Sequence, residues 1–287
     1  MLRRRAITAG FASLGAGIGG CFGTGEEDSD EFESNGSRGG GGEPTPVDDE
    51  GYPVVADVDW GVERRRPTDP ENFRFWLTMH RQPPGNGVRF NYADGWQPDH
   101  VGELFDFTDL AQQSVTGSLL HANAATYLGT FDVDELLQHV EAADEYERTG
   151  EYGGFHLVND RIAIGPDAIV VSTFDVDYDV PIDRYNGKRK PLEAIDPGVT
   201  RLFEELPPGG SLEGEYVAPI RDALGVETGY LRGISSDTVE SRECTWVYLF
   251  TDESHVTDTV LSKLESPLAH VRRTEIDGRV ARLFGTV

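Results

Sequence analysis

The chain has 287 residues, of which 38% are hydrophobic, enough for a packed core. Its formal net charge is −26, from 51 acidic and 25 basic residues, and the only lysines are Lys188, Lys190 and Lys263. So negative a surface repels nucleic acid and anionic lipid, and we expect neither as a binding partner.

The acidic, lysine-poor composition resembles that of proteins from extremely halophilic archaea. In molar salt the Debye length falls to about 3 Å, so repulsion between neighbouring carboxylates is screened. The same charge keeps a protein soluble and monomeric where salting-out threatens. The composition therefore predicts a halophilic protein, and the alternative is a protein that binds cations or basic partners.

Residues 1–20 have the organisation of an export signal. An arginine run at residues 3–5 precedes an uncharged, weakly apolar stretch that is too short to span a bilayer as a helix. Arg4 and Arg5, followed by Ala6-Ile7, resemble a twin-arginine signal, a route that exports folded proteins. We therefore expect Arg4 and Arg5 to be the residues that direct export.

Ile18-Gly19-Gly20-Cys21 resembles the lipobox of bacterial and archaeal lipoproteins, in which a small pair precedes a cysteine that becomes lipidated. Two acyl chains on Cys21 would give stable membrane attachment. Residues 21–52 continue as an acidic, glycine-rich spacer with the composition of a disordered segment. We expect a lipoprotein anchored to the cell membrane on its extracellular side; the alternative is an ordinary secretory peptide that contains a cysteine.

The second cysteine, Cys244, has no disulfide partner if Cys21 is acylated. It lies in an apolar, strand-like run with Trp246 and Val247. A buried free thiol is the interpretation that this setting favours.

Two parts of the folded region have the same predicted order of elements. Residues 126–132 and 247–252 are strand-like runs that end at an acid, and apolar residues at helical spacing follow each acid. Asp132 with Glu135 is similar to a capping box. Predicted hairpins follow at residues 158–163 and 276–281, where Asn-Asp and Asp-Gly suit tight turns.

This order predicts an α+β fold of two ferredoxin-like strand–helix–strand–strand halves with antiparallel sheets, after a disordered N-terminal tether. The predicted boundaries are 53–190 and 191–287. Other segments predict a strand at 73–80, a helix at 99–110, a helix at 191–206 broken at Pro197-Gly198, a helix at 216–224 and a strand at 230–239.

Residues 127–132, 150–155 and 167–171 resemble uncharacterised exported lipoproteins of halophilic archaea, which share the export signal, the acidic spacer and this order of elements. The resemblance covers most of the chain. It implies the location and the fold, and it implies no activity.

The sequence contains no recognisable catalytic motif. None of its seven histidines has the spacing of a zinc-protease helix, and no serine lies in a Gly-x-Ser-x-Gly elbow. A non-catalytic structural or interaction module is therefore favoured over an enzyme. Two alternatives stay open: a module that binds a ligand or cation between the two halves, and a hydrolase whose residues meet only in the fold.

Asp175, Asp177 and Asp179 form the best candidate metal site. Acids at alternate positions put oxygens on one side of an extended loop, an arrangement that suits Ca²⁺. No other cofactor is expected, and a solvated acidic loop is the alternative.

Two basic clusters, at residues 64–66 and 188–190, stand out in this acidic chain. Each either pairs with nearby acids or forms a loop that docks an anion or a partner.

Replacing Cys21 should release the protein from the membrane, because the acyl anchor is lost. In Cys21→Ser, immunoblots of membrane and medium fractions should show the protein in the medium. Cys244→Ser removes the other thiol and is the matched control, which should stay with the membrane. Membrane association of both variants would contradict lipid anchoring.

Overall fold

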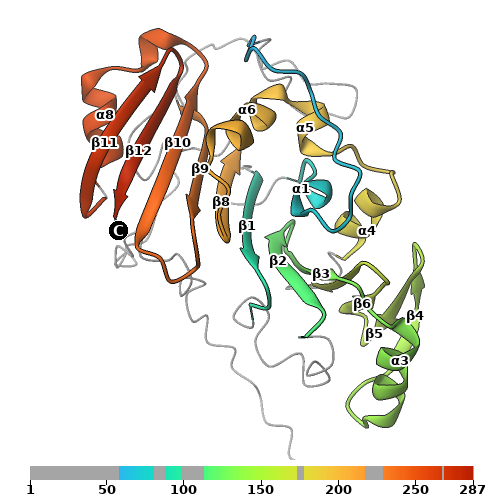
Figure 1. The fold of residues 1–287 in the computed structure, drawn as a ribbon. Helices are drawn as coiled ribbons and strands as arrows, with labels where there is room; N and C mark the ends of the chain where they lie inside the picture. Colours follow the sequence, from blue (N-terminus) through green and yellow to red (C-terminus); the bar gives the residue numbers. More distant parts are fainter. Residues whose placement is uncertain are drawn as a thin grey trace, which may run out of the picture.

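The computed structural model describes residues 58–80, 88–97, 113–172, 178–216, 229–266 and 268–286. The fold is α+β: the described strands form one large antiparallel sheet with helices packed against it (Figure 1). The elements in chain order are α1 (Phe73–Trp76), β1 (Val88–Asp94), β2 (Val115–His121), β3 (Ala124–Gly129), α3 (Val133–Ala142), β4 (Arg148–Tyr152), β5 (Phe155–Val158), β6 (Ile162–Ile164), β7 (Ala168–Ser172), α4 (Asp179–Tyr185), α5 (Leu192–Ile195), α6 (Pro197–Glu205), β8 (Ser211–Tyr216), β9 (Gly229–Ser236), β10 (Glu243–Phe250), the 3₁₀ helix η3 (Glu253–His255), α8 (Asp258–Glu265), β11 (His270–Asp277) and β12 (Val280–Thr286).

The twelve strands of the described residues follow the order β11-β12-β10-β9-β8-β1-β2-β3-β7-β6-β5-β4. At the centre of the sheet, β1 and β8 pair from Val88 opposite Tyr216 to Ala93 opposite Ser211. We call this junction the β1·β8 seam. Because of it, the strands of both predicted halves belong to one sheet, and the expectation of separate sheets is corrected.

The sheet has helices on both faces, as the side chains of single strands show. Tyr127 of β3 packs in the cluster that contains Leu137 of α3, whereas its neighbour Leu128 packs in the cluster that contains Leu202 of α6. Successive strand residues point to opposite faces. One face therefore carries α1, α4, α5 and α6, and the other carries α3 near one end and α8 near the other.

The predicted helix starts are confirmed at one position and shifted at the other. Asp132 accepts a hydrogen bond from the backbone N–H of Glu135 at 3.0 Å, and α3 follows directly. Asp252 instead caps η3, and α8 begins only after Thr257, whose hydroxyl accepts from the N–H of Val260 at 3.3 Å. A second capping side chain thus divides the predicted helix in two.

The predicted strand at 73–80 is wrong. Asn72 caps α1 by accepting from the N–H of Arg74, which starts a helical turn and buries Phe75 and Trp76. Extended backbone follows only as an isolated bridge between Thr78 and Pro191. Four residues are too few for the helical period to be read from the sequence.

Of the remaining predicted elements, two are confirmed and two lie wholly or almost wholly outside the described residues. The broken helix at 191–206 is confirmed as α5 and α6, with Asp196 accepting from the N–H of Gly198 at 2.7 Å at the break. The strand at 230–239 is confirmed as β9. The helix at 99–110 lies outside the described residues, as does nearly all of the helix at 216–224.

Both predicted turns join strands. Asn159 and Asp160 have φ of 51° and 53° between β5 and β6. Between β11 and β12, Asp277 pairs with Val280, so the loop consists of Gly278, with φ of 56°, and Arg279. Positive φ at these residues is what such tight turns require.

Both edge strands of the sheet, β4 and β11, carry charged residues. Arg148 of β4 pairs with Glu151 at 2.5 Å, and Arg273 of β11 pairs with Glu275 at 3.2 Å. None of the helices in the described ranges combines the length and hydropathy needed to cross a bilayer.

A half-buried carboxyl group, that of Glu213, lies on the β1·β8 seam. Glu213 pairs with Asn91 across the seam, while Glu215, two residues along β8, binds Arg89 and Arg232 at 2.6 Å each. Both arginines form ion pairs with Glu215. Burial is therefore the largest influence on the pKa of Glu213. Burial raises the pKa of Glu213 to about 7, against the attraction of Arg232.

Glu213 should make the protein less stable as the pH rises. The folded state holds this proton up to about pH 7, whereas the unfolded chain loses it near pH 4.5, so the free energy of unfolding falls between these values and is lowest above them. Glu213→Gln should remove this fall, which is on the order of 2–3 kcal/mol. Melting at fixed salt across pH 4–8 measures it.

Glu141→Gln, on the exposed side of α3, is the matched control and should leave the pH profile unchanged. A Glu213→Gln profile that follows the parent would show that Glu213 is ionised in the folded state at ordinary pH.

Candidate functional site

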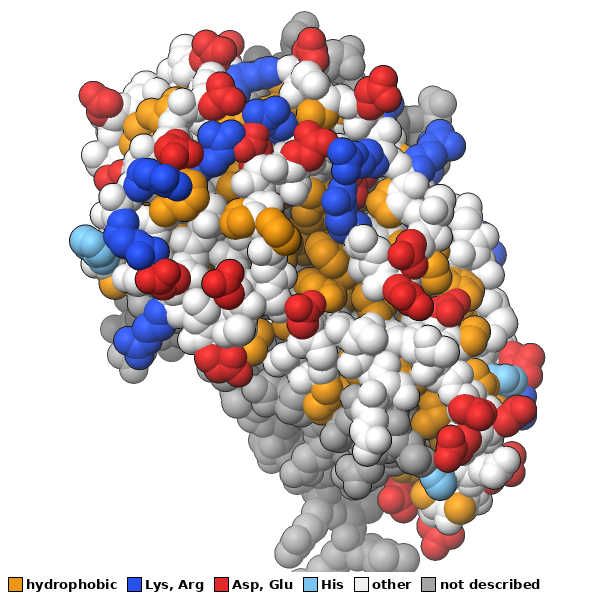
Figure 2. All heavy atoms as spheres, in the orientation of Figure 1, with side chains coloured by type: hydrophobic (Ala, Val, Ile, Leu, Met, Phe, Trp, Pro, Cys, Tyr) orange, Lys and Arg blue, Asp and Glu red, His pale blue; other side chains and the backbone are white. Residues whose placement is uncertain are grey.

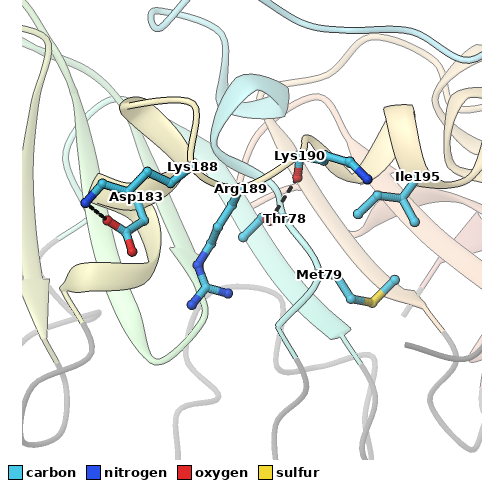
Figure 3. A pocket seen from close by; sticks show the side chains of 7 residues that line it. All are labelled: Thr78, Met79, Asp183, Lys188, Arg189, Lys190 and Ile195. Carbon is cyan, nitrogen blue, oxygen red and sulfur yellow. Dashed lines mark hydrogen bonds and ion pairs between the residues drawn. The ribbon is translucent and has the colours of Figure 1, made fainter. Parts of the chain in front are cut away.

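A pocket of about 310 Å³ opens beside α4 and α5, on the face of the sheet that carries α1 (Figure 3). Its volume lies at the lower end of the range of ~300–1,000 Å³ typical of small-molecule sites. We call it the cationic pocket. Its lining residues come from the segment after α1, from α4, from the α4–α5 connection and from α5: Thr78, Met79, Asp183, Lys188, Arg189, Lys190 and Ile195.

The α4–α5 connection is folded back onto α4 by backbone hydrogen bonds. Gly187 has φ of 73° and donates its N–H to the carbonyl of Arg184 at 3.1 Å. The N–H groups of Lys188 and Arg189 both donate to the carbonyl of Asp183, at 2.9 and 3.3 Å. Glycine tolerates this left-handed conformation, so the sequence Asn-Gly turns the chain and presents three consecutive basic side chains.

The segment after α1 holds the other end of this connection. The hydroxyl of Thr78 donates to the carbonyl of Lys190 at 2.9 Å, and the N–H of Leu192 donates to the carbonyl of Leu77 at 2.9 Å. Two segments more than 100 residues apart in the chain are therefore joined around the pocket. A substitution at Thr78 would loosen the loop that carries the cations.

Asp183 is the acidic residue among those that line the pocket, and it is already neutralised. It accepts hydrogen bonds from Nζ of Lys188 and from the hydroxyl of Tyr152, both at 2.8 Å. Burial alone would raise the pKa of Asp183, but the bonds from Lys188 and Tyr152 outweigh it and lower the pKa below its ordinary value. Asp183 is therefore ionised, and Lys188 balances its charge.

Arg189 extends into the pocket between Asp183 and Met79 (Figure 3). Its Nε is buried and has no hydrogen-bond partner within the described part of the chain. Buried donors in proteins nearly always have partners, so an unpartnered one facing a cavity needs an explanation. Lys190 lines the other side of the pocket.

A buried, neutral histidine, His121, contacts the backbone of Thr78 next to the pocket. Nδ1 of His121 lies 2.9 Å from the carbonyl oxygen of Arg89, and Nε2 lies 3.1 Å from the carbonyl oxygen and 3.3 Å from the N–H of Thr78. In the tautomer with the proton on Nδ1, the ring donates to Arg89 and accepts from the N–H of Thr78. Burial lowers the pKa of His121 to about 4, so the imidazole is uncharged at neutral pH. Only the neutral ring can accept at Nε2 while donating at Nδ1.

The other wall of the pocket is apolar. Met79 is 2% exposed and belongs to the central core cluster, and Ile195 is half-buried against the same cluster. In Figure 3, Lys190 and Ile195 flank one end of the cavity and Met79 lies below them. Cationic and apolar groups thus face the same small volume.

The surface also shows an apolar depression. Figure 2 shows hydrophobic side chains in a depression near the middle of one face, with acidic and basic side chains interspersed above it. Aromatic rings from three elements meet on the face of α1 and α6: Phe73 stacks on Tyr92 at 4.2 Å and meets Phe203 edge-on at 5.7 Å. These rings pack on one another. The cationic pocket combines a cavity with charged groups.

The structure brings together part of what the sequence predicted. The cluster at 188–190 lines the cationic pocket, while Arg65 of the cluster at 64–66 pairs with Glu204 at 2.6 Å on the surface. Cys244 is a buried free thiol, as predicted. Sequence reasoning missed Thr78, Met79 and Ile195, which carry no local signal and reach the pocket only through the fold.

The other predicted site residues stay predictions. Cys21, Arg4, Arg5, Asp175 and Asp177 lie outside the described residues. Asp179 is the first residue of α4. Among the described residues, no group of three or more His, Cys, Asp or Glu side chains could hold a metal ion.

Comparisons with known proteins give no family. No family model matches the chain, and no curated protein matches it. A structure of TP0453, crystal form III, is similar over 77% of this chain and 94% of its own, with a TM-score of 0.40 and 11% identity. Crystal form IV of TP0453 gives a TM-score of 0.35 and 9% identity, over 70% of this chain and 89% of its own.

Asp183 should stabilise the protein through its two hydrogen bonds. Asp183→Asn should lower the free energy of unfolding at pH 7 by about 1–2 kcal/mol, since bonds to a charged acceptor are lost. The difference should shrink as the pH falls through the ordinary range of an aspartate, because the pKa of Asp183 is lowered and its stabilisation is present only above that range.

Chemical denaturation of both proteins from pH 3 to 7 measures this difference. Asp144→Asn, at an exposed turn, is the control and should match the parent. Equal stability of parent and Asp183→Asn at every pH would contradict the assignment of an ionised, paired Asp183.

Proposed function

We propose that the protein is an exported binding protein that takes a small anion in the cationic pocket. The observation that carries the proposal is Arg189: a partly buried guanidinium whose Nε has no partner in the described part of the chain and which faces a cavity of about 310 Å³. Among the alternatives open from the sequence, this favours a ligand-binding module over a purely structural one.

The charge of the whole chain makes this local arrangement informative. A protein of net charge −26 repels anions at long range, yet three basic side chains surround one cavity with a single, neutralised aspartate. In molar salt the repulsion is screened beyond about 3 Å, while contacts inside the pocket act at shorter distances. Binding of an anion is then decided by Arg189.

The proposed setting is the extracellular side of the cell membrane, with the chain held through an acylated Cys21 after export directed by Arg4 and Arg5. The lipobox-like sequence and the acidic spacer support this. The membrane anchor is the expected partner surface, and nucleic acid is not expected. The acidic, lysine-poor composition supports a halophilic environment.

We also propose that the fold is an internal duplication. Supporting it, the strand order reads alike from the seam outwards: β1-β2-β3-β7-β6 on one side and β8-β9-β10-β12-β11 on the other. Tyr127 pairs with Ile169 and Tyr248 pairs with Ala281 at matching positions. Each copy has one helix packed between its hairpins, fewer than the ferredoxin-like order requires.

In the proposed duplication, the cationic pocket lies beside the segment that connects the two copies. Helices α4, α5 and α6 form the connection between β7 and β8, that is, between the two copies. The predicted boundary at residues 190 and 191 falls within this connection. The pocket therefore belongs to the segment that links the copies, which agrees with the idea of a ligand site between halves.

Anion binding is tested with Arg189→Gln, which removes the guanidinium and its charge and leaves a shorter, neutral polar side chain. Calorimetric titration with inorganic phosphate, acetate and 4-methylpentanoate, at fixed ionic strength, should show binding of at least one anion to the parent and at least tenfold weaker binding to the variant. Arg64→Gln, at an exposed arginine outside the pocket, is the control and should bind like the parent.

Failure of the parent to bind any of the three anions would overturn the proposed function. Equal binding by the parent and Arg189→Gln would move the site away from this pocket.

A further inference from the structure

We infer that the cationic pocket takes an oxyanion that donates a hydrogen bond of its own, as hydrogen phosphate and the hydroxycarboxylates do. This inference rests on the proposed function and deepens it, because it names the class of anion. Two residues that line the pocket carry it: Arg189 offers a hydrogen-bond donor, and Asp183 offers an acceptor.

Asp183 uses one of its two carboxylate oxygens for hydrogen bonds within the described part of the chain. Nζ of Lys188 and the hydroxyl of Tyr152 both donate to Oδ1, at 2.8 Å each. Figure 3 shows the other oxygen turned away from Lys188, on the side of the carboxylate that faces Arg189. An ionised carboxylate accepts at both oxygens, so Oδ2 is an acceptor for a group inside the pocket.

The backbone fixes the positions of these two residues relative to each other. Asp183 belongs to α4, and Arg189 follows the turn at Gly187. The N–H groups of Lys188 and Arg189 both donate to the carbonyl of Asp183, at 2.9 and 3.3 Å. The positive charge of Arg189 is also among the influences that lower the pKa of Asp183. A ligand held by Arg189 therefore meets the carboxylate of Asp183 as well.

This pair of groups distinguishes anions by the protons that they carry. Chloride, sulfate and simple carboxylates accept hydrogen bonds and donate none. Bound to Arg189, each of them would place a second acceptor beside Oδ2 of Asp183 and leave that oxygen without a partner. Hydrogen phosphate and hydroxycarboxylates have an O–H group next to their anionic oxygens, so they bind Arg189 and donate to Asp183 together. A site that hydrogen-bonds such a group rejects the analogue that lacks it.

Calorimetry on the parent protein, at pH 7 and fixed ionic strength, tests the inference with two matched pairs of anions. Inorganic phosphate carries a proton at this pH, whereas sulfate has the same shape and carries none. Glycolate differs from acetate by one hydroxyl group. In at least one pair, the anion with the donor should bind at least tenfold more tightly. The tighter binder of phosphate and glycolate then identifies the source of the donor.

Asp183→Asn changes the group that faces the pocket from an acceptor to a donor. Because Lys188 and Tyr152 both donate, the amide oxygen should take the place of Oδ1 and the NH₂ group the place of Oδ2. The variant should therefore lose the preference for the anion with the donor. The readout is a ratio of two affinities, which a loss of stability alone does not change. Asp144→Asn, at an exposed turn, is the control and should keep the ratio of the parent.

The outcomes separate the two claims. A preference below tenfold in both pairs, or a preference that Asp183→Asn keeps, would overturn the ligand class, while the anion site stands if Arg189→Gln weakens binding. No binding of phosphate, sulfate, glycolate, acetate or 4-methylpentanoate to the parent would overturn both claims.

Discussion

The pairing of β1 with β8 is the interaction on which the rest of the structure depends. Six residue pairs, from Val88 opposite Tyr216 to Ala93 opposite Ser211, join two groups of strands into one sheet. Because the seam fixes these two groups side by side, the chain between them must cross one face of the sheet. Helices α4, α5 and α6 make that crossing, and the cationic pocket forms beside them. The position of this pocket at the linking segment is thus a geometric result of the seam.

Two carboxylates that are withdrawn from water are paired with basic side chains. Glu215 joins Arg89 and Arg232 on the seam, and Asp183 joins Lys188 at the pocket. Breaking such a pair leaves a buried charge without compensation, which is strongly destabilising. Arg189 departs from this pattern, as does the buried Arg184, whose Nε also has no hydrogen-bond partner in the described part of the chain. Burial raises the pKa of Glu213 to about 7, so the charge of this group depends on the pH.

Local signals in the sequence predicted the elements that local forces decide. The cap at Asp132, the break between α5 and α6 and the turn residues between β5 and β6 all depend on neighbours within a few residues. The seam was not predicted, because no residue pattern in β1 or β8 indicates which strand it pairs with. The two strands lie more than 100 residues apart in the chain. The same limit applies to the pocket: the basic run 188–190 was visible, while Met79 and Ile195 resemble ordinary core residues until the fold places them together.

In the membrane-anchored setting that we propose, the charged edge strands have a consequence. Many copies fixed to one membrane would meet in two dimensions at high local density, where an open strand could template the next molecule. Arg148 and Glu151 on β4, and Arg273 and Glu275 on β11, would have to lose water for two sheets to merge edge to edge. Crowding on a lipid layer would therefore leave the copies as separate particles and keep them from growing into fibres.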